Sequence, residues 1–414
     1  MKSVIKFLPK IIIAFLLVLV GMLAQEKWQV LSAQTPFFHS ASTQSDQIKV
    51  SRKTTTELNM PQFWEAYAYL KRDYLDPEKL KDKDKMVDGA TSGMVASIGD
   101  PYTMYLPPKE NKRSGEDLAG KFYGVGIELG YKDGVLAVVA PLPGSPAEKA
   151  GVKAGDLILK VKDPARNFEE ETANWSLNKA VENIRGPKDT VVTLTLYRKG
   201  ENKDKPFDVD ITRGEIVVNT VKLEFTQVNG KEVAHLKLMR FGGNTDAEWN
   251  QAVDQILAKK DQLAGVVLDL RNNPGGFFNE AINVASTFIP SGEIVKQEGR
   301  YTDESFKATG NARLAGMPVV VLVNKGSASA SEIVAGALRD RLQTKLVGER
   351  TFGKGTVQDV RELSNGGGMH ITVARWVLPS GDWINEKGLP VDIEVKDDPN
   401  TQVDEVLQKS VSAL

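Results

Sequence analysis

The sequence of 414 residues contains no cysteine and only three histidines, His39, His235 and His370. The lack of cysteine excludes disulfides, thiol nucleophiles and thiolate metal sites, and the lack of a His-x-x-x-His pair argues against zinc. Aromatic residues make up only 7%, the formal net charge is −1, and no basic stripe with interleaved aromatics is present. We therefore expect no metal, no other cofactor and no nucleic-acid partner.

The scarcity of histidine also disfavours a Ser-His-Asp hydrolase, which needs a histidine as general base. His39 lies in a Ser/Thr/Gln-rich stretch, His235 in an alternating strand pattern and His370 after a triple glycine, and none sits in a turn of its own with a carboxylate partner. No Gly-x-Ser-x-Gly elbow is present. Residues 348–354 fit Gly-x-x-x-x-Gly-Lys, but Gly355 stands where a phosphate loop has Ser or Thr, which disfavours nucleotide binding.

The amino terminus combines basic residues with a short apolar run. Lys2, Lys6 and Lys10 precede the apolar residues 11–24, a pattern typical of a signal peptide or signal anchor. The run is shorter than the ~20 residues of a membrane-spanning helix, and only Ser32 and Ala33 offer a weak cleavage site. Residues 1–33 therefore predict an extracytoplasmic protein of the cell envelope, either anchored or exported and cleaved. Residues 34–57 read as a linker.

Residues 58–118 form a predicted amino-terminal helical segment. Phe63, Tyr67, Leu70 and Tyr74 recur at helical spacing, and a second helical run covers residues 86–98. A Gly-Asp-Pro-Tyr cluster then breaks the pattern. This segment is too small to hold a large core alone.

Residues 119–213 change to a β-rich pattern. Ser145 begins a short helix with Pro146 at its first position, Glu148 completing a capping box and Gly151 ending it. We expect strands over residues 124–129, 134–139, 156–161 and 190–197, and a second helix over 176–184.

The Gly-Ser-Pro-Ala-x-x-Ala-Gly-Val-x-x-Gly-Asp-x-Ile run of residues 144–158 resembles a PDZ domain. The resemblance implies a groove between the strand at Ile127 and the second helix, where a peptide adds as a strand. Its terminal carboxylate would bind backbone N–H groups around Gly124, Val125 and Gly126. The alternative is that these glycines only permit a bulge or tight turn. The polar residues 162–175 indicate an insertion that affects the shape of the groove.

From residue 214 to 398, longer apolar strands alternate with helices. Residues 263–270 predict a buried parallel strand, which ends in Arg-Asn-Asn-Pro-Gly-Gly before a helix over 278–288. Residues 319–323 predict the next strand, and a Gly-Ser-Ala-Ser-Ala-Ser-Glu cluster separates it from another helix. Both turns follow the carboxyl end of a parallel strand, so they should lie at the same end of the sheet.

Two interpretations of the serine cluster remain open from the residues alone. Ser329 and Glu332 fit a capping box at a helix start, and the same place suits a serine nucleophile surrounded by free N–H groups. Lys354 could serve as the base, with Thr356 and Gln358 on the same face of an extended strand. Its pKa would have to fall by ~3 units, worth roughly 4 kcal/mol, through burial in an apolar pocket.

Four motifs together resemble the carboxy-terminal processing peptidases, or tail-specific proteases, which are Ser-Lys serine proteases. They are the serine cluster at 326–332, Gly-Glu-Arg-Thr-Phe-Gly-Lys-Gly-Thr-Val-Gln at 348–358, Leu-Arg-x-Asn-Pro-Gly-Gly at 270–276 and Gly-Asp-Pro-Tyr-Thr-Met-Tyr at 99–105. The resemblance implies a multidomain fold of α/β and α+β parts. A PDZ-like module precedes a crotonase-like ββα protease core over 214–398, and residues 399–414 form a carboxy-terminal tail.

The resemblance also implies roles for individual residues. It makes Ser329 the nucleophile, Lys354 the base and Gln358 the residue that orients the lysine. It implies that the backbone of Gly275 or Gly276 and of Ala330 stabilises the oxyanion. It also implies that Arg185 couples the PDZ-like groove to the active site. The implied partners are proteins or peptides with free, apolar carboxyl ends, and a homodimer is compatible with it. The rival hypothesis is an anchored PDZ-type adaptor with an inactive protease-like core.

Overall fold

The computed structural model describes residues 60–200, 204–396 and 403–414. The described residues fall into two units, which divide between Lys83 and Asp84. The predicted signal or anchor segment and the linker lie outside the described residues. In the described ranges, no helix combines the length and the apolar character needed to cross a bilayer.

The first unit contains helix α2 (Pro61–Asp73) and the 3-10 turn η1 (Pro77–Leu80). Pro61 stands at the first helical position, where its missing N–H costs nothing. Helix α2 has no buried residue, in line with the expectation that this segment holds no core of its own.

The next elements are α3 (Lys83–Ala96), all but the first residue of which belongs to the second unit, β1 (Met104–Leu106) and α4 (Pro108–Ala119). Between α3 and β1, the Asp100 carboxylate accepts hydrogen bonds from the Tyr102 N–H at 3.0 Å and the Thr103 hydroxyl at 2.6 Å. This turn brings β1 to pair antiparallel with β18 (Gly368–Val377). The predicted helical segment therefore also supplies an edge strand to the carboxy-terminal half of the chain.

The β-rich module forms as expected, except that the predicted strand 124–129 is wrong. It divides into β2 and β3 because Val125 and Gly126 interrupt the extended backbone, with Gly126 at a φ of +74°. A Cβ on Gly126 would lie 2.5 Å from the Ser145 Cβ, so only glycine fits there. The elements are β2 (Lys121–Gly124), β3 (Ile127–Lys132), β4 (Val135–Pro141), α5 (Pro146–Lys149), β5 (Leu157–Asp163), η2 (Pro164–Arg166), β6 (Phe168–Glu171), α6 (Leu177–Ile184), β7 (Val191–Tyr197) and β8 (Phe207–Thr212), with β9 (Gly214–Val217) returning to pair with β2.

The polar stretch 162–175 is structured and belongs to this module. Strand β6 pairs with β5, and Trp175 is buried in the module's core. Asp163 binds the fully buried guanidinium of Arg213 at 2.6 Å, while Arg213 Nε donates to the Ile184 carbonyl at 2.9 Å. The stretch thus helps to fix the end of helix α6.

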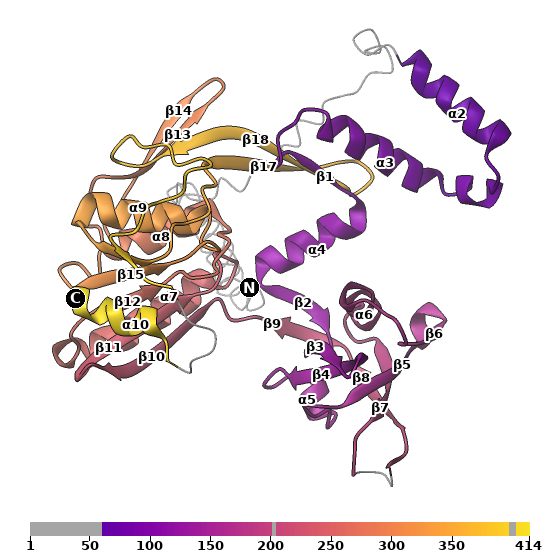
Figure 1. Cartoon of the computed structure of the whole chain (residues 1–414), viewed down its shortest axis with the longest axis horizontal. Coiled ribbons are helices and arrows are strands. Elements are labelled where there is room, and N and C mark those ends of the chain that lie inside the picture. Colours follow the sequence, from indigo (N-terminus) through magenta and orange to yellow (C-terminus); the bar gives the residue numbers. More distant parts are fainter. Residues whose placement is uncertain (1–59, 201–203, 397–402) are drawn as a thin grey trace, which may run out of the picture. The chain divides into compact units, whose positions relative to one another are not determined.

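The carboxy-terminal half is built on a six-stranded sheet in the order β10-β11-β12-β15-β16-β19 (Figure 1). Strands β11, β12, β15, β16 and β19 run parallel, and β10 pairs antiparallel with β11. The strand predicted at 319–323 is confirmed as β15 with the same bounds. The strands are β10 (Val221–Val228), β11 (Lys231–Leu238), β12 (Val266–Asp269), β15 (Val319–Val323), β16 (Lys345–Gly348) and β19 (Ile393–Glu394).

Both faces of this sheet are covered. Leu268 and Val321 face the larger core, which α7, α8 and α9 close, whereas Val267 and Val320 face a smaller core that contains Val406 of the terminal segment. A second sheet has the order β1-β18-β13-β14, with β17 also pairing with β18. The remaining elements are α7 (Thr245–Ala258), η4 (Lys260–Gln262), α8 (Phe278–Ser286), β13 (Glu293–Gly299), β14 (Asp303–Lys307), α9 (Ala330–Leu342), β17 (Thr356–Glu362), α10 (Glu405–Ser410) and η5 (Val411–Ala413).

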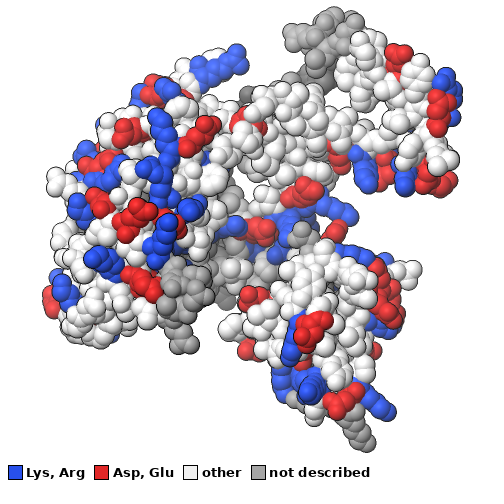
Figure 2. Space-filling model, in the orientation of Figure 1, with Lys and Arg blue, Asp and Glu red and all other residues white. Residues whose placement is uncertain are grey.

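Acidic and basic side chains are interspersed on the face drawn in Figure 2, and neither sign gathers into an extended patch among the described residues there. This distribution agrees with the net charge of −1. Among the described residues, that face therefore carries no basic patch that would attract a polyanion such as a nucleic acid.

Candidate active site

The two glycine-rich turns meet at the carboxyl ends of β12 and β15, as the sequence predicts. The Ala328 N–H donates to the Asn273 carbonyl at 3.0 Å, and the Ser331 hydroxyl donates to the same oxygen at 2.9 Å. The Asn324 side-chain amide donates to the Asn272 side-chain oxygen at 2.9 Å. The strands therefore place the serine cluster directly against the turn that contains Gly275.

Ser329 has a backbone conformation unlike that of an ordinary cap. The caps Ser145 and Ser176 are extended, with φ/ψ of −69°/161° and −72°/156°. Ser329 has a φ of 56° and a ψ of −115°, a region that costs a residue with a side chain about 1–3 kcal/mol. A helix cap has no need of this strain, whereas nucleophiles are often held in such turns.

Glu332 has a larger role than the capping box predicted for it. Its carboxylate is fully buried and accepts the Ser329 N–H at 2.8 Å, which is the predicted contact. It also accepts the Thr351 hydroxyl at 2.5 Å and the N–H groups of Gly353 and Lys354 at 2.7 and 2.9 Å. Burial raises the pKa of Glu332, although these donors oppose the shift. The Glu332 side chain thus connects the turn at Ser329 (the serine turn) to residues 351–354 (the lysine loop).

Lys354 is half-buried, and its ammonium lies 5.1 Å from the centroid of the Tyr102 ring. Burial lowers the pKa of Lys354, against the attraction of the Asp100 and Glu332 carboxylates. The direction of this shift is the one that a lysine base requires. Asp100 and Tyr102 come from the Gly-Asp-Pro-Tyr turn, so that motif forms part of the lysine's environment.

A single cavity of about 680 Å³ joins the residues that the sequence singled out. Helix α4 contributes Arg113 and Asp117 to its wall, and Phe278 and Trp376 contribute apolar surface. All six residues predicted for catalysis line it: Ser329, Lys354, Gln358, Gly275, Gly276 and Ala330.

The glycine turn packs closely on the serine. A Cβ on Gly275 would lie 2.9 Å from the Ser329 Cβ and 3.0 Å from the Ala330 nitrogen. The Gly275 N–H is already engaged by the Asn273 side-chain oxygen at 2.9 Å. Within the described ranges, the N–H groups of Gly276 and Ala330 donate to no acceptor. Those two groups are therefore available to an oxyanion.

Gln358 lines the same cavity as Lys354, but its amide donates to the hydroxyls of Thr356 at 2.9 Å and Thr372 at 3.1 Å. The prediction that Lys354, Thr356 and Gln358 share one strand face is wrong in part. Strand β17 begins only at Thr356, and its pairing with β18 shifts register between Val357 and Gln358. Lys354 reaches the cavity from the preceding loop.

The histidines occupy different places. His370 lines the cavity; burial and the Lys354 charge lower its pKa, and its buried Nε2 has no partner among the described residues. His235 lies 3.0 Å from the Asp269 carboxylate, but it lies within strand β11, as the alternating pattern predicts, and not in a turn of its own. His235 is not among the residues that line the cavity.

The predicted peptide groove has an open edge. Strand β3 is an edge strand of its sheet and packs beside α6. The carbonyls of Val125 and Gly126 accept hydrogen bonds from Ala147 at 2.9 Å and Leu142 at 3.0 Å. In the described part of the chain, the N–H groups of Val125 and Gly126 have no acceptor. Ile127 begins the strand to which a peptide would add.

Arg185 lies at the end of helix α6 and contacts helix α4. Its Nη1 is 3.5 Å from the Asp117 carboxylate, and its guanidinium stacks on Phe122 at 3.8 Å from the ring centroid. Asp117 and Arg240 both line the catalytic cavity, and Arg240 Nη1 donates to the Asp117 carbonyl at 3.0 Å. Arg185 therefore touches a residue of the cavity wall.

Comparison with known proteins assigns this architecture. Peptidase family S41 matches residues 232–395, the PDZ domain matches 116–197, and the amino-terminal domain of the activating protease CtpB matches 17–110. The carboxy-terminal processing protease CtpA of Bacillus subtilis (strain 168) is 37% identical over 332 residues, which cover 80% of this chain and 68% of that protein. The chain belongs to the carboxy-terminal processing proteases of family S41.

One further relative agrees with this assignment, and one solved structure agrees in fold. A carboxy-terminal-processing protease of Bartonella bacilliformis is 36% identical over 367 residues, covering 87% of this chain and 80% of that protein. A solved structure from Bacteroides fragilis, assigned to the S41 proteases, shares 16% identity and a TM-score of 0.51 over 85% of this chain and 96% of that one. The latter supports the fold alone. The chain is thus a serine-type peptidase with a PDZ domain before its protease core.

Proposed function

We propose that this chain is an endopeptidase that cleaves proteins near their carboxyl ends with a Ser329–Lys354 dyad, after its PDZ groove has bound the substrate's carboxyl end. The observation that carries the proposal is the strained backbone of Ser329 in the cavity that also holds Lys354. Family membership supports the same chemistry.

In the proposed reaction, neutral Lys354 removes the hydroxyl proton as the Ser329 Oγ attacks the scissile carbonyl carbon. The tetrahedral oxyanion is stabilised by the free N–H groups of Gly276 and Ala330, in a setting where one such donor is worth about 3 kcal/mol. Collapse breaks the C–N bond, and protonated Lys354 returns its proton to the leaving amine. Water then hydrolyses the acyl-enzyme ester, which regenerates Ser329.

Substrate recognition would use the edge of strand β3. A peptide adding to that strand would direct its terminal carboxylate toward the unpaired N–H groups of Val125 and Gly126, beside Gly124. The contact of Arg185 with Asp117 supports a coupling role, because a ligand that disturbs this pair also changes the cavity wall. Gln358, held by two threonine hydroxyls, would help to keep Lys354 in place.

The amino-terminal pattern of residues 1–33 supports a location in the cell envelope, with the catalytic parts outside the cytoplasm. This location is part of the proposal, as are membrane anchoring and a homodimer. A mass measurement of the mature protein decides between a retained anchor and a cleaved signal peptide.

The experiment is to incubate the full chain with a protein substrate that ends in apolar residues, alongside Ser329→Ala and Lys354→Ala. Wild type should release carboxy-terminal fragments, and both variants should lose at least about 10⁴-fold in kcat. The adaptor hypothesis predicts that all three proteins bind the peptide and that none cleaves it. That result would overturn the proposal.

A further inference from the structure

The carboxy-terminal segment is part of the protease core. Residues 403–414 form α10 and η5 on the sheet face that carries Val267 and Val320, and Val406 and Val411 are buried against that face (Figure 1). The Asp404 carboxylate caps α10 by accepting the Leu407 N–H at 2.8 Å. The position of Asp404 is thus fixed by the packed helix.

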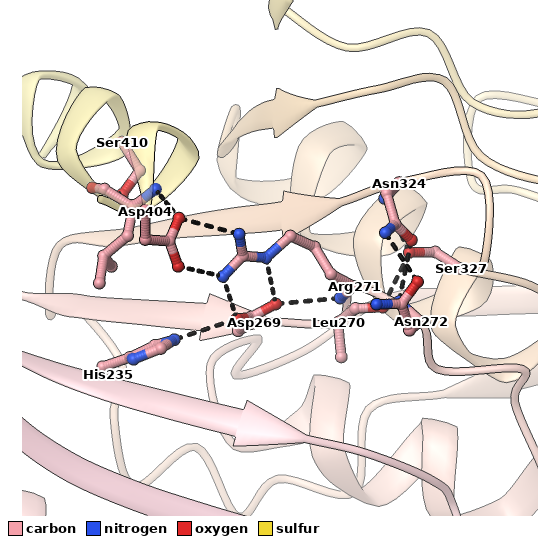
Figure 3. Close-up of polar contacts among 10 residues, drawn as sticks. His235, Asp269, Leu270, Arg271, Asn272, Asn324, Ser327, Asp404 and Ser410 are labelled. Carbon is pink, nitrogen blue, oxygen red and sulfur yellow. Dashed lines mark hydrogen bonds and ion pairs between the residues drawn. The ribbon is translucent and has the colours of Figure 1, made fainter. Parts of the chain in front are cut away.

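Arg271 is clamped between two carboxylates (Figure 3). Its Nη1 and Nη2 donate to the two oxygens of Asp404 at 2.9 and 2.7 Å. Its Nε and Nη2 donate to the two oxygens of Asp269 at 2.9 and 2.6 Å. Asp269 is fully buried and only 12% of the Arg271 side chain is exposed. Such paired forks fix the plane of a guanidinium.

Arg271 is also where strand β12 turns toward the glycine turn. The adjoining backbone is tied to the serine loop on both sides, because the Leu270 carbonyl accepts the Ser327 hydroxyl at 2.8 Å and the Asn272 N–H donates to Asn324 at 2.8 Å. Figure 3 shows these contacts beside the arginine clamp. A movement of Arg271 would therefore displace both turns that line the cavity.

We propose that Asp404, through Arg271, is a positioning residue that sets the place of the 272–276 turn relative to Ser329. Asp269, the last residue of β12, lies only two residues before Arg271, so its contact with Arg271 is local along the chain. Asp404 holds the Arg271 guanidinium from a distant part of the chain, at the start of the packed helix α10. The inference rests on the proposed function, since it assigns the terminal segment a part in the same reaction.

The test is Asp404→Asn in the full chain. Asparagine caps helices as well as aspartate does, so α10 should persist while the charged clamp is lost. The matched control is Asp392→Asn, which removes a charge pair with Lys345, at 3.2 Å, at the opposite ends of the strands. The two aspartates are similarly exposed, since 29% of the Asp392 side chain and 34% of the Asp404 side chain is accessible. Asp404→Glu, which keeps the charge, serves as the rescue.

We expect D404N to lower kcat per titrated active site about fivefold to thirtyfold with KM unchanged, less than the ~100-fold of a deleted oxyanion donor. Backbone amides of residues 270–278 should exchange hydrogen faster in D404N and not in D392N, and D404E should recover part of the rate. Unchanged kcat and exchange, or equal losses in D404N and D392N, would overturn the inference. If wild type itself shows no turnover, the proposed function fails, and the exchange comparison still decides whether Asp404 positions the turn.

Discussion

The catalytic turns and the PDZ groove are both built where strands end, but they are held very differently. Around Ser329, a single buried carboxylate collects four donors, and the glycine turn packs within contact distance of the serine. Around Val125, the described structure leaves two N–H groups and a strand edge without partners. Under the proposed function, the catalytic groups are preorganised before a substrate arrives, whereas the peptide ligand itself would complete the hydrogen bonds of the groove.

A pair of matched glycine variants tests whether the catalytic turns and the PDZ groove can be impaired separately. Gly275→Ala adds a methyl group 2.8 Å from the Ala328 carbonyl at a φ of +98°, and should cut kcat by more than about 100-fold while peptide binding persists. Gly126→Ala should abolish peptide binding and spare kcat on a short ester without a free carboxyl end. Fluorescence anisotropy and ester hydrolysis measure the two properties. Equal loss of both in both variants would show that the regions are not separable.

Glu332→Gln tests the tie between the serine turn and the lysine loop. The amide cannot satisfy all four donors, so the free energy of unfolding should fall by about 2–4 kcal/mol. With Lys354 displaced, kcat should fall about thirtyfold, in keeping with small misplacements of catalytic groups. Chemical denaturation and steady-state kinetics measure these effects, with the exposed Glu362→Gln as control. A variant as active as wild type would contradict the assigned role.

The lowered pKa of Lys354 predicts a pH dependence. Because the base is the neutral amine, kcat/KM should rise roughly tenfold per pH unit up to an apparent pKa below the ordinary ~10.4 of lysine. The unfolded chain binds this proton more readily than the folded one, so the free energy of unfolding should rise with pH between the lowered pKa of Lys354 and the ordinary ~10.4 of lysine. A pH–rate profile with no ascending limb below the ordinary lysine pKa would contradict Lys354 as base.

The smallest effect is expected for Arg185→Ala, which removes the contact between the PDZ domain and Asp117. The preference for a substrate with a free carboxyl end over its amide should shrink about five- to tenfold, a usual size for coupling between sites. The control is Lys109→Ala, because Lys109 and Glu182 form an exposed pair, at 3.6 Å, that also joins α4 to α6. If both variants behave alike, Arg185 has no special coupling role.

Much of this arrangement could be predicted because short-range patterns encode it. The buried strand at 319–323, the cap at Ser145 and the placing of two turns at one sheet edge follow from periodicity, capping chemistry and parallel topology. The strand predicted across Gly126 was wrong because its apolar pattern continues through a residue whose positive φ is imposed by packing against Ser145.

The contacts that tie the site together could not be predicted in the same way. Glu332 was recognised as a cap, but its bonds to the 351–354 loop join positions about twenty residues apart. Asp404 and Arg271 are separated by 133 residues, and nothing in either local pattern indicates the other. The sequence shows only that His370 follows a triple glycine, whereas pairing between β17 and β18 brings it into the cavity. Such pairings depend on the completed fold.

Labelling of the full chain with a fluorophosphonate, followed by peptide mass mapping, tests whether Ser329 is the nucleophile and Lys354 its base. We expect one adduct, on Ser329, with labelling abolished in Ser329→Ala and strongly slowed in Lys354→Ala. An adduct on Ser327 or Ser331 would contradict the nucleophile assignment. An unchanged rate in Lys354→Ala would contradict the dyad.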